Sequence, residues 1–211
     1  MPIVGGPILE RPQAIIFDIG RVIIPVDLTR SFEDFGKRDG LSVDQVWTAL
    51  QTDAHWDDWQ EGRMSPADWH KHLCEKFELS FGFREFCESW NRVLNPVTLL
   101  PDELFERLST HCRLALLSNT DPIHVAHIEA TYDFVRHFPV RIYSCRVGAS
   151  KPGSTIFHHA LRELAALPEE TIYIDDLREN VNAAVSLGMI GFHFTSPSEL
   201  LGELSRLGLW S

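Results

Sequence analysis

The chain has 211 residues, of which 44% are hydrophobic and 23% are charged, a composition typical of a folded protein with one good core and an appended module. Its formal net charge of −11 disfavours a nucleic-acid partner, because an acidic surface repels a phosphate backbone. Its apolar runs are much shorter than the roughly 20 residues of a membrane-spanning helix, so we expect no membrane partner.

The start of the chain and its cysteines indicate the compartment. The first residues lack a basic stretch followed by an apolar one of about 7–15 residues, and this favours a cytoplasmic protein. The four cysteines are far apart and include no Cys-x-x-Cys pair, so we expect reduced thiols. Residues 1–12 are rich in proline and glycine and show no periodicity, which predicts a loose arm.

Short apolar runs that end in polar residues predict the strands of a parallel sheet. The run 14–17 ends at Asp18, and the run 113–117 ends at Ser118. Further strands are expected at residues 140–144, 171–174 and 190–194. Ligands of parallel sheets bind beyond the carboxyl ends of the strands, where these polar residues stand.

Helical patterns alternate with the later strands. Apolar residues recur at three- and four-residue steps after Pro122 and after Ser154, and a third pattern covers residues 178–187 before Gly188. The segment 198–207 has the pattern of a terminal amphipathic helix. This alternation predicts an α/β fold with a three-layer, Rossmann-like core and a parallel sheet.

Residues 28–96 contain no strand pattern. Ser42 with Gln45, and Ser65 with Asp68, have the spacing of helix N-termini, and a third helix is predicted around residues 83–94. We therefore expect an all-helical cap at 28–96, inserted after the first strand. The core domain would then consist of residues 1–27 and 97–211.

Four short motifs follow the predicted strands in chain order. They are Phe17-Asp18-Ile19-Gly20-Arg21-Val22, Leu117-Ser118-Asn119-Thr120, Ser150-Lys151-Pro152 and Ile174-Asp175-Asp176. Each alone is common in loops, but their order after predicted strands is specific. Together they resemble the four signature motifs of the haloacid dehalogenase superfamily, and the resemblance covers the chain from about residue 14 to its end, helical cap included.

The resemblance assigns Asp18 the role of nucleophile. A carboxylate can attack phosphorus and form an aspartyl-phosphate, which divides one difficult displacement into two easier ones. Attack on a phosphate dianion needs charge neutralisation, and hard carboxylate oxygens suit Mg²⁺. The resemblance implies that Asp18, the backbone carbonyl of Gly20 and Asp176 bind this ion, with Asp175 acting one layer out or through a water.

The remaining motif residues are expected to contact the substrate phosphate. The Ser118 hydroxyl and the Asn119 backbone amide would donate hydrogen bonds to phosphoryl oxygens that gain charge in the reaction. Lys151 would add a positive charge opposite the metal. Arg21 replaces the Asn or Gly usual at its position, and we expect it to narrow the pocket or to contact the phosphate.

Gly20 departs from the phosphatase pattern, in which an aspartate two residues after the nucleophile serves as general acid and then as base. Such help is worth about 10²–10⁴-fold in rate. Three alternatives therefore stay open: a phosphatase restricted to good leaving groups, a metal-independent haloacid dehalogenase, and a phosphate- or metabolite-binding pseudoenzyme without turnover. The paired acids Asp175 and Asp176 disfavour the dehalogenase, since they are hard to explain without a cation.

The cap segment Glu61-Gly62-Arg63-Met64-Ser65 and an Asp-Asp-x-x-x-Asn pattern ending at Asn180 resemble the sugar-1-phosphate phosphatases. We therefore expect an Mg²⁺-dependent phosphomonoester hydrolase, a monomer or homodimer, acting on a small phosphorylated metabolite such as a sugar 1-phosphate. An anomeric oxygen leaves more readily than a simple alcohol, so this substrate tolerates a missing acid.

Other residues are weaker candidates. Five of the six tryptophans lie in the predicted cap and are expected mainly in its core, with Trp56 and Trp59 as the best candidates for the pocket. His55 is an alternative proton donor from the cap. His124 and His127 have the spacing of two metal ligands on one helix face, but no third ligand is apparent.

Overall fold

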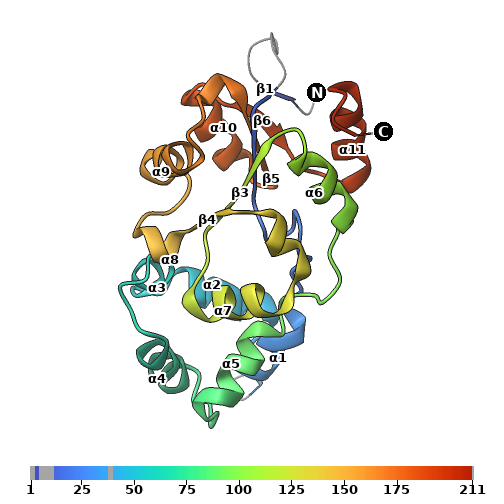
Figure 1. Ribbon diagram of the computed structural model, residues 1–211. Coiled ribbons are helices and arrows are strands. Elements are labelled where there is room, and N and C mark those ends of the chain that lie inside the picture. Colours follow the sequence, from blue (N-terminus) through green and yellow to red (C-terminus); the bar gives the residue numbers. More distant parts are fainter. Residues whose placement is uncertain (1–2, 5–11, 38–39, 211) are drawn as a thin grey trace.

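The computed structural model describes residues 3–4, 12–37 and 40–210. Its strands form one six-stranded sheet in the order β1-β6-β5-β2-β3-β4 (Figure 1), in which β1 pairs antiparallel with β6 and the other pairs are parallel. The strands are β1 (Ile3–Val4), β2 (Ala14–Phe17), β3 (Arg113–Ser118), β4 (Val140–Tyr143), β5 (Thr171–Asp175) and β6 (Ile190–His193). All five strands predicted from the sequence are present, within one residue at each end.

Strand β1 corrects the prediction of a loose arm at residues 1–12. Ile3 pairs with Phe192 and Val4 with Gly191, so the chain adds a short edge strand to the sheet. Two residues are too few to show an alternating pattern, and such a strand is defined by its backbone pairing alone. Except for Pro12, the rest of this arm lies outside the described residues.

The sheet has a layer of helices on each face. In β2, Ile15 and Phe17 pack into one hydrophobic cluster, whereas Ala14 and Ile16 pack into the other. Helices α6 (Asp102–Ser109) and α11 (Pro197–Arg206) contribute to the first cluster, and α9 (Ser154–Leu164) and α10 (Arg178–Ser186) to the second (Figure 1). This confirms the predicted three-layer α/β core. Helix α6 is not among the elements predicted from the sequence.

Shorter elements connect the remaining strands. Helix α7 (Pro122–Thr131) follows β3 as predicted and leads through the 3₁₀ segment η1 (Asp133–His137) into β4. Ser144, predicted as the last residue of a strand, instead begins the one-turn helix α8 (Ser144–Val147). A second 3₁₀ segment, η2 (Pro168–Glu170), precedes β5.

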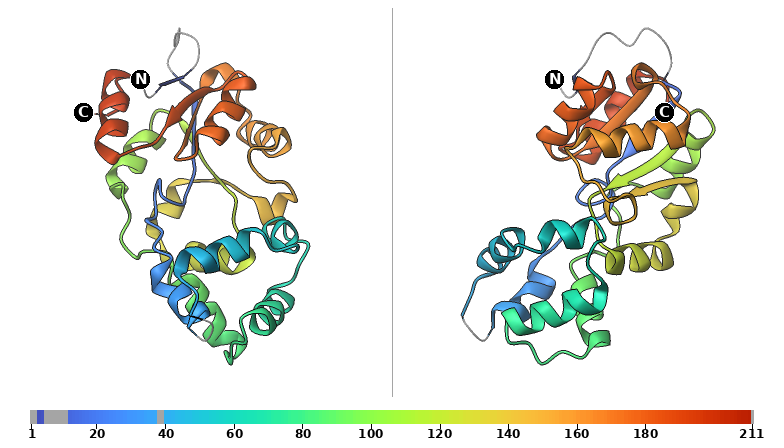
Figure 2. Two further views of the ribbon diagram at one scale, coloured as in Figure 1. Left: turned by 180° about the vertical axis from the view of Figure 1, so that it is seen from behind. Right: turned by 90° about the vertical axis from the view of Figure 1, so that its left-hand side faces the viewer.

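The insertion between β2 and β3 is helical, and Figure 2 shows it as a separate lobe beside the sheet. Its helices are α1 (Thr29–Gly36), α2 (Val43–Gln51), α3 (Trp56–Gln60), α4 (Pro66–Lys76) and α5 (Phe83–Asn91). The Ser42 hydroxyl accepts from the Gln45 N–H at 3.2 Å, and the Ser65 hydroxyl from the Asp68 N–H at 3.2 Å, so both predicted N-termini are confirmed. Helices α1 and α3 are additional, and α3 is too short to show a helical period.

The lobe has an aromatic core. Trp59 and Trp69 are fully buried and stack with ring centroids 5.3 Å apart, so the prediction that Trp59 faces the pocket is wrong. Two extended segments join the lobe to the sheet and bond to each other, Asp27 N–H to Val93 O at 2.8 Å and Asn95 N–H to Pro25 O at 3.0 Å. The predicted domain boundaries, after residues 27 and 96, lie next to these paired segments and stay a prediction. No helix in the described ranges is both long and apolar enough to cross a membrane.

Candidate active site

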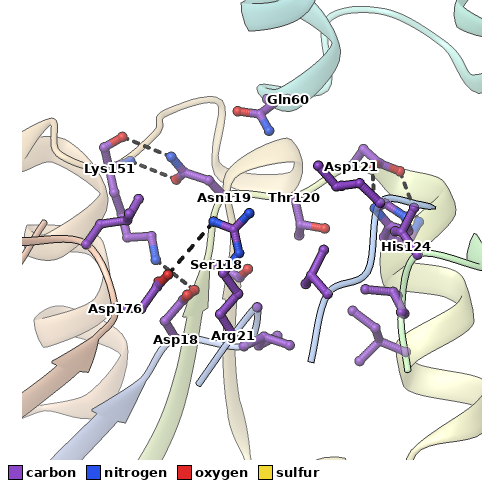
Figure 3. A pocket seen from close by; sticks show the side chains of 18 of the residues that line it. Asp18, Arg21, Gln60, Ser118, Asn119, Thr120, Asp121, His124, Lys151 and Asp176 are labelled. Carbon is purple, nitrogen blue, oxygen red and sulfur yellow. Dashed lines mark hydrogen bonds and ion pairs between the residues drawn. The ribbon is translucent and has the colours of Figure 1, made fainter. Parts of the chain in front are cut away.

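A cavity of about 220 Å³ lies between the carboxyl ends of the central strands and the helical lobe. Side chains from the end of β3 and from the loops after β2 and β3 point into it together with residues of the cap (Figure 3). It is lined by every residue predicted for the site except Asp175, namely Asp18, Gly20, Arg21, Ser118, Asn119, Lys151 and Asp176. The topology thus brings together four motifs that are far apart in the sequence.

Lys151 is the buried positive charge of the site. Its Nζ donates to Asp18 Oδ1 at 2.8 Å, to Asp175 Oδ2 at 2.8 Å and to the Leu117 carbonyl at 3.0 Å. Burial alone would lower the pKa of this ammonium, but the two carboxylates outweigh it and raise the pKa. Lys151 therefore stays charged beside the predicted nucleophile.

Asp18 stands at the end of β2, where its N–H donates to the Ile174 carbonyl at 2.9 Å. Burial raises the pKa of its carboxyl group to about 7; Asp175 adds to this shift and Lys151 opposes it. A negative charge on the buried Asp18 is thus unfavourable as long as the Lys151 ammonium is the main positive charge beside it. A cation next to Asp18 would favour the ionised form that nucleophilic attack requires.

The two acids of the fourth motif have different environments. Asp175 is fully buried and accepts from Lys151, the Tyr173 hydroxyl, the Leu177 N–H at 2.8 Å and the Asn180 side chain at 3.1 Å. Its oxygens are therefore committed to the protein. Asp176 faces the cavity, and burial together with the charge of Asp175 raises its pKa.

Carboxylate oxygens of Asp18, Asp175 and Asp176 lie within 4.8 Å of one another, and within the described ranges this is the one group of three potential metal ligands. Hard oxygen atoms at this spacing fit Mg²⁺, which commonly takes one or two carboxylates. Because Asp175 already has four donors, Asp18 and Asp176 are the better direct ligands. The pair His124 and His127 does not form such a group.

Asn119 has a contact that was not predicted. Its side-chain amide donates to the Lys151 carbonyl at 2.9 Å, and its Oδ1 accepts from the Lys151 N–H at 2.8 Å (Figure 3). This pair of bonds joins the loop after β3 to the lysine loop. The sequence shows that an asparagine stands in the motif. It does not show that this side chain bonds to Lys151, which lies 32 residues further along the chain.

Gly20 and Arg21 differ in backbone conformation from what their residue types suggest. Arg21 takes a left-handed φ of 60°, whereas Gly20 has no positive φ. A Cβ built on Gly20 would lie 3.7 Å from Cγ2 of Val26, an ordinary contact distance. Position 20 therefore does not require glycine. The half-exposed Arg21 guanidinium lies 3.9 Å from Asp176 Oδ2, on the cavity side (Figure 3).

A buried ion pair borders the cavity and was missed by the sequence reasoning. Asp121 caps α7 through Oδ1, and its Oδ2 lies 2.8 Å from His124 Nδ1 and accepts from the Trp90 indole at 3.0 Å. Burial opposes both charges, yet their mutual attraction outweighs it, so the pKa of Asp121 is lowered and that of His124 is raised. The Asp-Pro pair at the start of α7 was a usable sequence signal for the helix N-cap. It did not indicate that Asp121 also contacts His124 and Trp90.

Residues of the cap contribute to the cavity. Trp56 lines it as predicted, together with Gln60, which was not predicted. His55 is exposed, its ring packs against His72 at a centroid distance of 4.8 Å, and it is absent from the described lining of the cavity. The structure therefore does not support His55 as the proton donor.

The family model of the haloacid dehalogenase-like hydrolases matches residues 13–188. The chain belongs to this family. Curated relatives of this HAD-like hydrolase include a D-ribitol-5-phosphate phosphatase from Bacteroides thetaiotaomicron, 23% identical over 197 residues that cover 90% of this chain and 96% of the relative. Another is the sesquiterpene phosphatase astK from Aspergillus oryzae, 24% identical over 204 residues that cover 92% and 96%.

Solved structures share the fold of this HAD-like hydrolase. A HAD family enzyme from B. thetaiotaomicron, in complex with magnesium and inorganic phosphate, aligns with a TM-score of 0.76 and 24% identity over 88% of this chain and 96% of that one. A HAD-like family hydrolase from Porphyromonas gingivalis aligns with a TM-score of 0.77 and 23% identity over 94% and 98%. The predicted superfamily and fold class are confirmed, and the sugar-1-phosphate branch stays a prediction.

Proposed function

We propose that this HAD-like hydrolase is a cytoplasmic, magnesium-dependent phosphomonoesterase that acts on a small phosphorylated metabolite through an aspartyl-phosphate on Asp18. The observation that carries the proposal is the cluster at the sheet edge, where Asp18 lies 2.8 Å from the Lys151 ammonium and within 4.8 Å of the cavity-facing Asp176. The two full-length curated relatives, both phosphatases, support it.

The reaction consists of two displacements at phosphorus. In the first, a carboxylate oxygen of Asp18 forms a bond to phosphorus while the bond to the substrate oxygen breaks, and the electron pair leaves with that oxygen. In the second, a water oxygen forms a bond to phosphorus while the bond from phosphorus to the Asp18 oxygen breaks, so the Asp18 carboxylate returns and the phosphate leaves with the protons of the water. Lys151 holds Asp18 in place, and the Ser118 hydroxyl and the Asn119 backbone amide donate to the phosphoryl oxygens.

Mg²⁺ would be held by Asp18, Asp176 and, on the strength of the family resemblance, the backbone carbonyl of Gly20. When bound, the ion supplies positive charge that allows the anionic nucleophile and the phosphate to approach. Asp175 would not bind the ion directly, because its oxygens already accept from Lys151 and from the Asn180 side chain at 3.1 Å.

The missing acid at Gly20 restricts the substrates. A leaving oxygen of low basicity departs without a proton, so acyl, aryl and anomeric phosphates, including sugar 1-phosphates, are the accessible classes. The dehalogenase alternative is disfavoured by the three carboxylates within 4.8 Å of one another, because the buried ammonium of Lys151, which contacts two of them, leaves part of their negative charge for a metal ion to balance. We also propose residues 28–96 as the cap domain and residues 1–27 with 97–211 as the core, in a monomer or homodimer.

Phosphate release from aryl phosphates, measured with and without Mg²⁺ in wild type and Asp18→Asn, tests the proposal. We expect Mg²⁺-dependent turnover in wild type and none in Asp18→Asn, because an amide is a far poorer nucleophile and metal ligand. Acid-quench mass spectrometry should find phosphate on the peptide that contains Asp18. Wild-type protein that binds Mg²⁺ but releases no phosphate from any ester would instead identify the pseudoenzyme.

A further inference from the structure

The cavity wall opposite the acids is mostly hydrocarbon. It is formed by Phe32, Trp47 and Trp56 of the cap and by Leu28, Val93 and Leu94 of the segments that join cap and core. We propose that the phosphorylated substrate carries a bulky apolar group that packs on this wall. This inference rests on the proposed phosphatase function, and it names the class of substrate: a hydrocarbon-rich phosphomonoester rather than a sugar phosphate.

The aromatic rings of the wall form one connected surface. Phe32 stacks on Trp47 with centroids 6.1 Å apart, and Trp47 meets Trp56 edge to face at 5.6 Å. Phe32 also touches the buried Trp90 at 5.9 Å. Trp47 and Trp56 are only partly buried, so each keeps accessible ring surface beside the cavity. Covering such surface with an apolar ligand removes it from water, which favours binding.

The polar groups of Asp121 and His124, which also line the cavity, already form hydrogen bonds within the protein. Asp121 accepts from the Ile123 N–H, the His124 N–H and the Trp90 indole, and it is paired with His124 Nδ1. His124 Nε2 lies 3.1 Å from the Trp90 carbonyl, so both ring nitrogens have partners. A charged imidazole has no further N–H to donate.

Within the described lining, Gln60, Thr120 and the indole N–H groups of Trp47 and Trp56 are the other polar groups away from the acid cluster. A sugar presents several hydroxyls, and each hydroxyl buried without a partner opposes binding. These groups include few acceptors for hydroxyl protons, so they cannot satisfy such a set. The wall therefore selects against polyhydroxylated groups and in favour of hydrocarbon.

Pairs of esters with leaving groups of similar acidity but different apolar size test the proposal. We expect kcat/KM for 2-naphthyl phosphate to exceed that for phenyl phosphate by about 10-fold or more. Trp56→Ala should remove most of the naphthyl preference. Phe83→Ala, which alters an aromatic side chain that is 46% exposed elsewhere in the cap, should leave the preference unchanged. Equal kcat/KM for the two aryl esters, or the highest value on glucose 1-phosphate, would overturn the proposal.

A binding measurement keeps this inference separate from the proposed function. Calorimetry with Mg²⁺ should show that 2-naphthylmethylphosphonate binds at least about 10-fold more tightly than methylphosphonate, whether or not any ester turns over. Equal affinities would overturn the inference even in an active enzyme. Should Trp56→Ala fail to fold, Leu28→Ala takes its place, and it too should reduce the ratio of the two affinities.

Discussion

The side-chain amide of Asn119 and the backbone of Lys151 form two reciprocal hydrogen bonds, 2.9 Å and 2.8 Å long. They connect the loop after β3 to the loop that carries the lysine, and the same lysine contacts Asp18 at 2.8 Å. Asn119 therefore positions the Lys151 charge beside Asp18 through the backbone, in addition to the contact predicted for its own amide.

Asn119→Ala should lower kcat by about 10²-fold on an aryl phosphate, because a catalytic group displaced by about 1 Å loses that much rate. The backbone N–H of residue 119 is retained, so the loss reports on the side chain. Asn182→Ala, which removes an exposed asparagine from α10, serves as the control and should leave kcat unchanged. An unaltered kcat in Asn119→Ala would show that the lysine loop holds its position without these bonds.

Asp176→Ala and Asp175→Ala should differ in their effects on Mg²⁺ binding and on stability. Asp176→Ala removes the cavity-facing carboxylate that we propose as a metal ligand, so it should weaken Mg²⁺ binding and alter stability little. Asp175→Ala leaves Lys151, Tyr173 and Asn180 without their shared acceptor, so the free energy of unfolding should fall by about 3–5 kcal/mol. Urea unfolding and an Mg²⁺ titration measure the two effects. Equal losses of Mg²⁺ affinity in both variants would contradict the assignment.

Gly20→Asp should restore activity toward poor leaving groups. Wild-type rates should depend steeply on leaving-group pKa, and the variant should gain most on alkyl phosphates, by up to about 10²–10⁴-fold. Space permits the change, since a Cβ at this position has its near contact with Val26 at 3.7 Å and the backbone is not left-handed. A flat wild-type dependence, with chemistry rate-limiting, would mean that another residue donates the proton.

Arg21→Gly should stabilise the folded protein and at the same time weaken phosphate binding. Arg21 has a left-handed φ of 60°, which costs a side-chain-bearing residue about 1 kcal/mol or more, so glycine should raise the free energy of unfolding. Loss of the guanidinium near Asp176 should weaken phosphate binding in the presence of Mg²⁺. Ala165→Gly, at another left-handed position at the end of α9 and outside the described lining of the cavity, should raise stability and leave phosphate binding unchanged. Unchanged phosphate affinity in Arg21→Gly would remove Arg21 from the binding residues.

The pair of Asp121 and His124 should make stability depend on pH. The folded-state pKa of His124 is raised above its ordinary 6.5, so its contribution is complete below that value and disappears as the pH rises through the folded-state pKa. The lowered pKa of Asp121 acts oppositely: its contribution is present above 3.8 and is lost as the pH falls through the lower folded-state value.

The difference in unfolding free energy between wild type and His124→Gln should therefore be about 3–5 kcal/mol near neutral or mildly acidic pH and shrink under alkaline conditions. Urea titrations across this range measure it. His158→Gln, at an exposed histidine on α9, should show no comparable trend. A difference that stays constant with pH would mean that His124 is uncharged in the folded protein.

The local pattern was sufficient for most of the fold. A strand such as β2 is buried on both faces, so its four apolar residues stand out in the sequence, and the capping pairs at Ser42 and Ser65 involve neighbours along the chain. Strand β1 and helix α3 escaped prediction because two and five residues are too few to show a period.

The sequence by itself determined which residues gather at the sheet edge, since parallel strands end on the same side and Asp18, Ser118 and Asp176 each stand at the end of a strand or directly after one. Only the tertiary structure decided how they interact. It placed Asp175 beneath Lys151, bonded Asn119 to the lysine loop and buried Trp59 instead of exposing it to the cavity. These contacts join segments that are distant in the chain, and their distances and burial follow from packing that no local periodicity encodes.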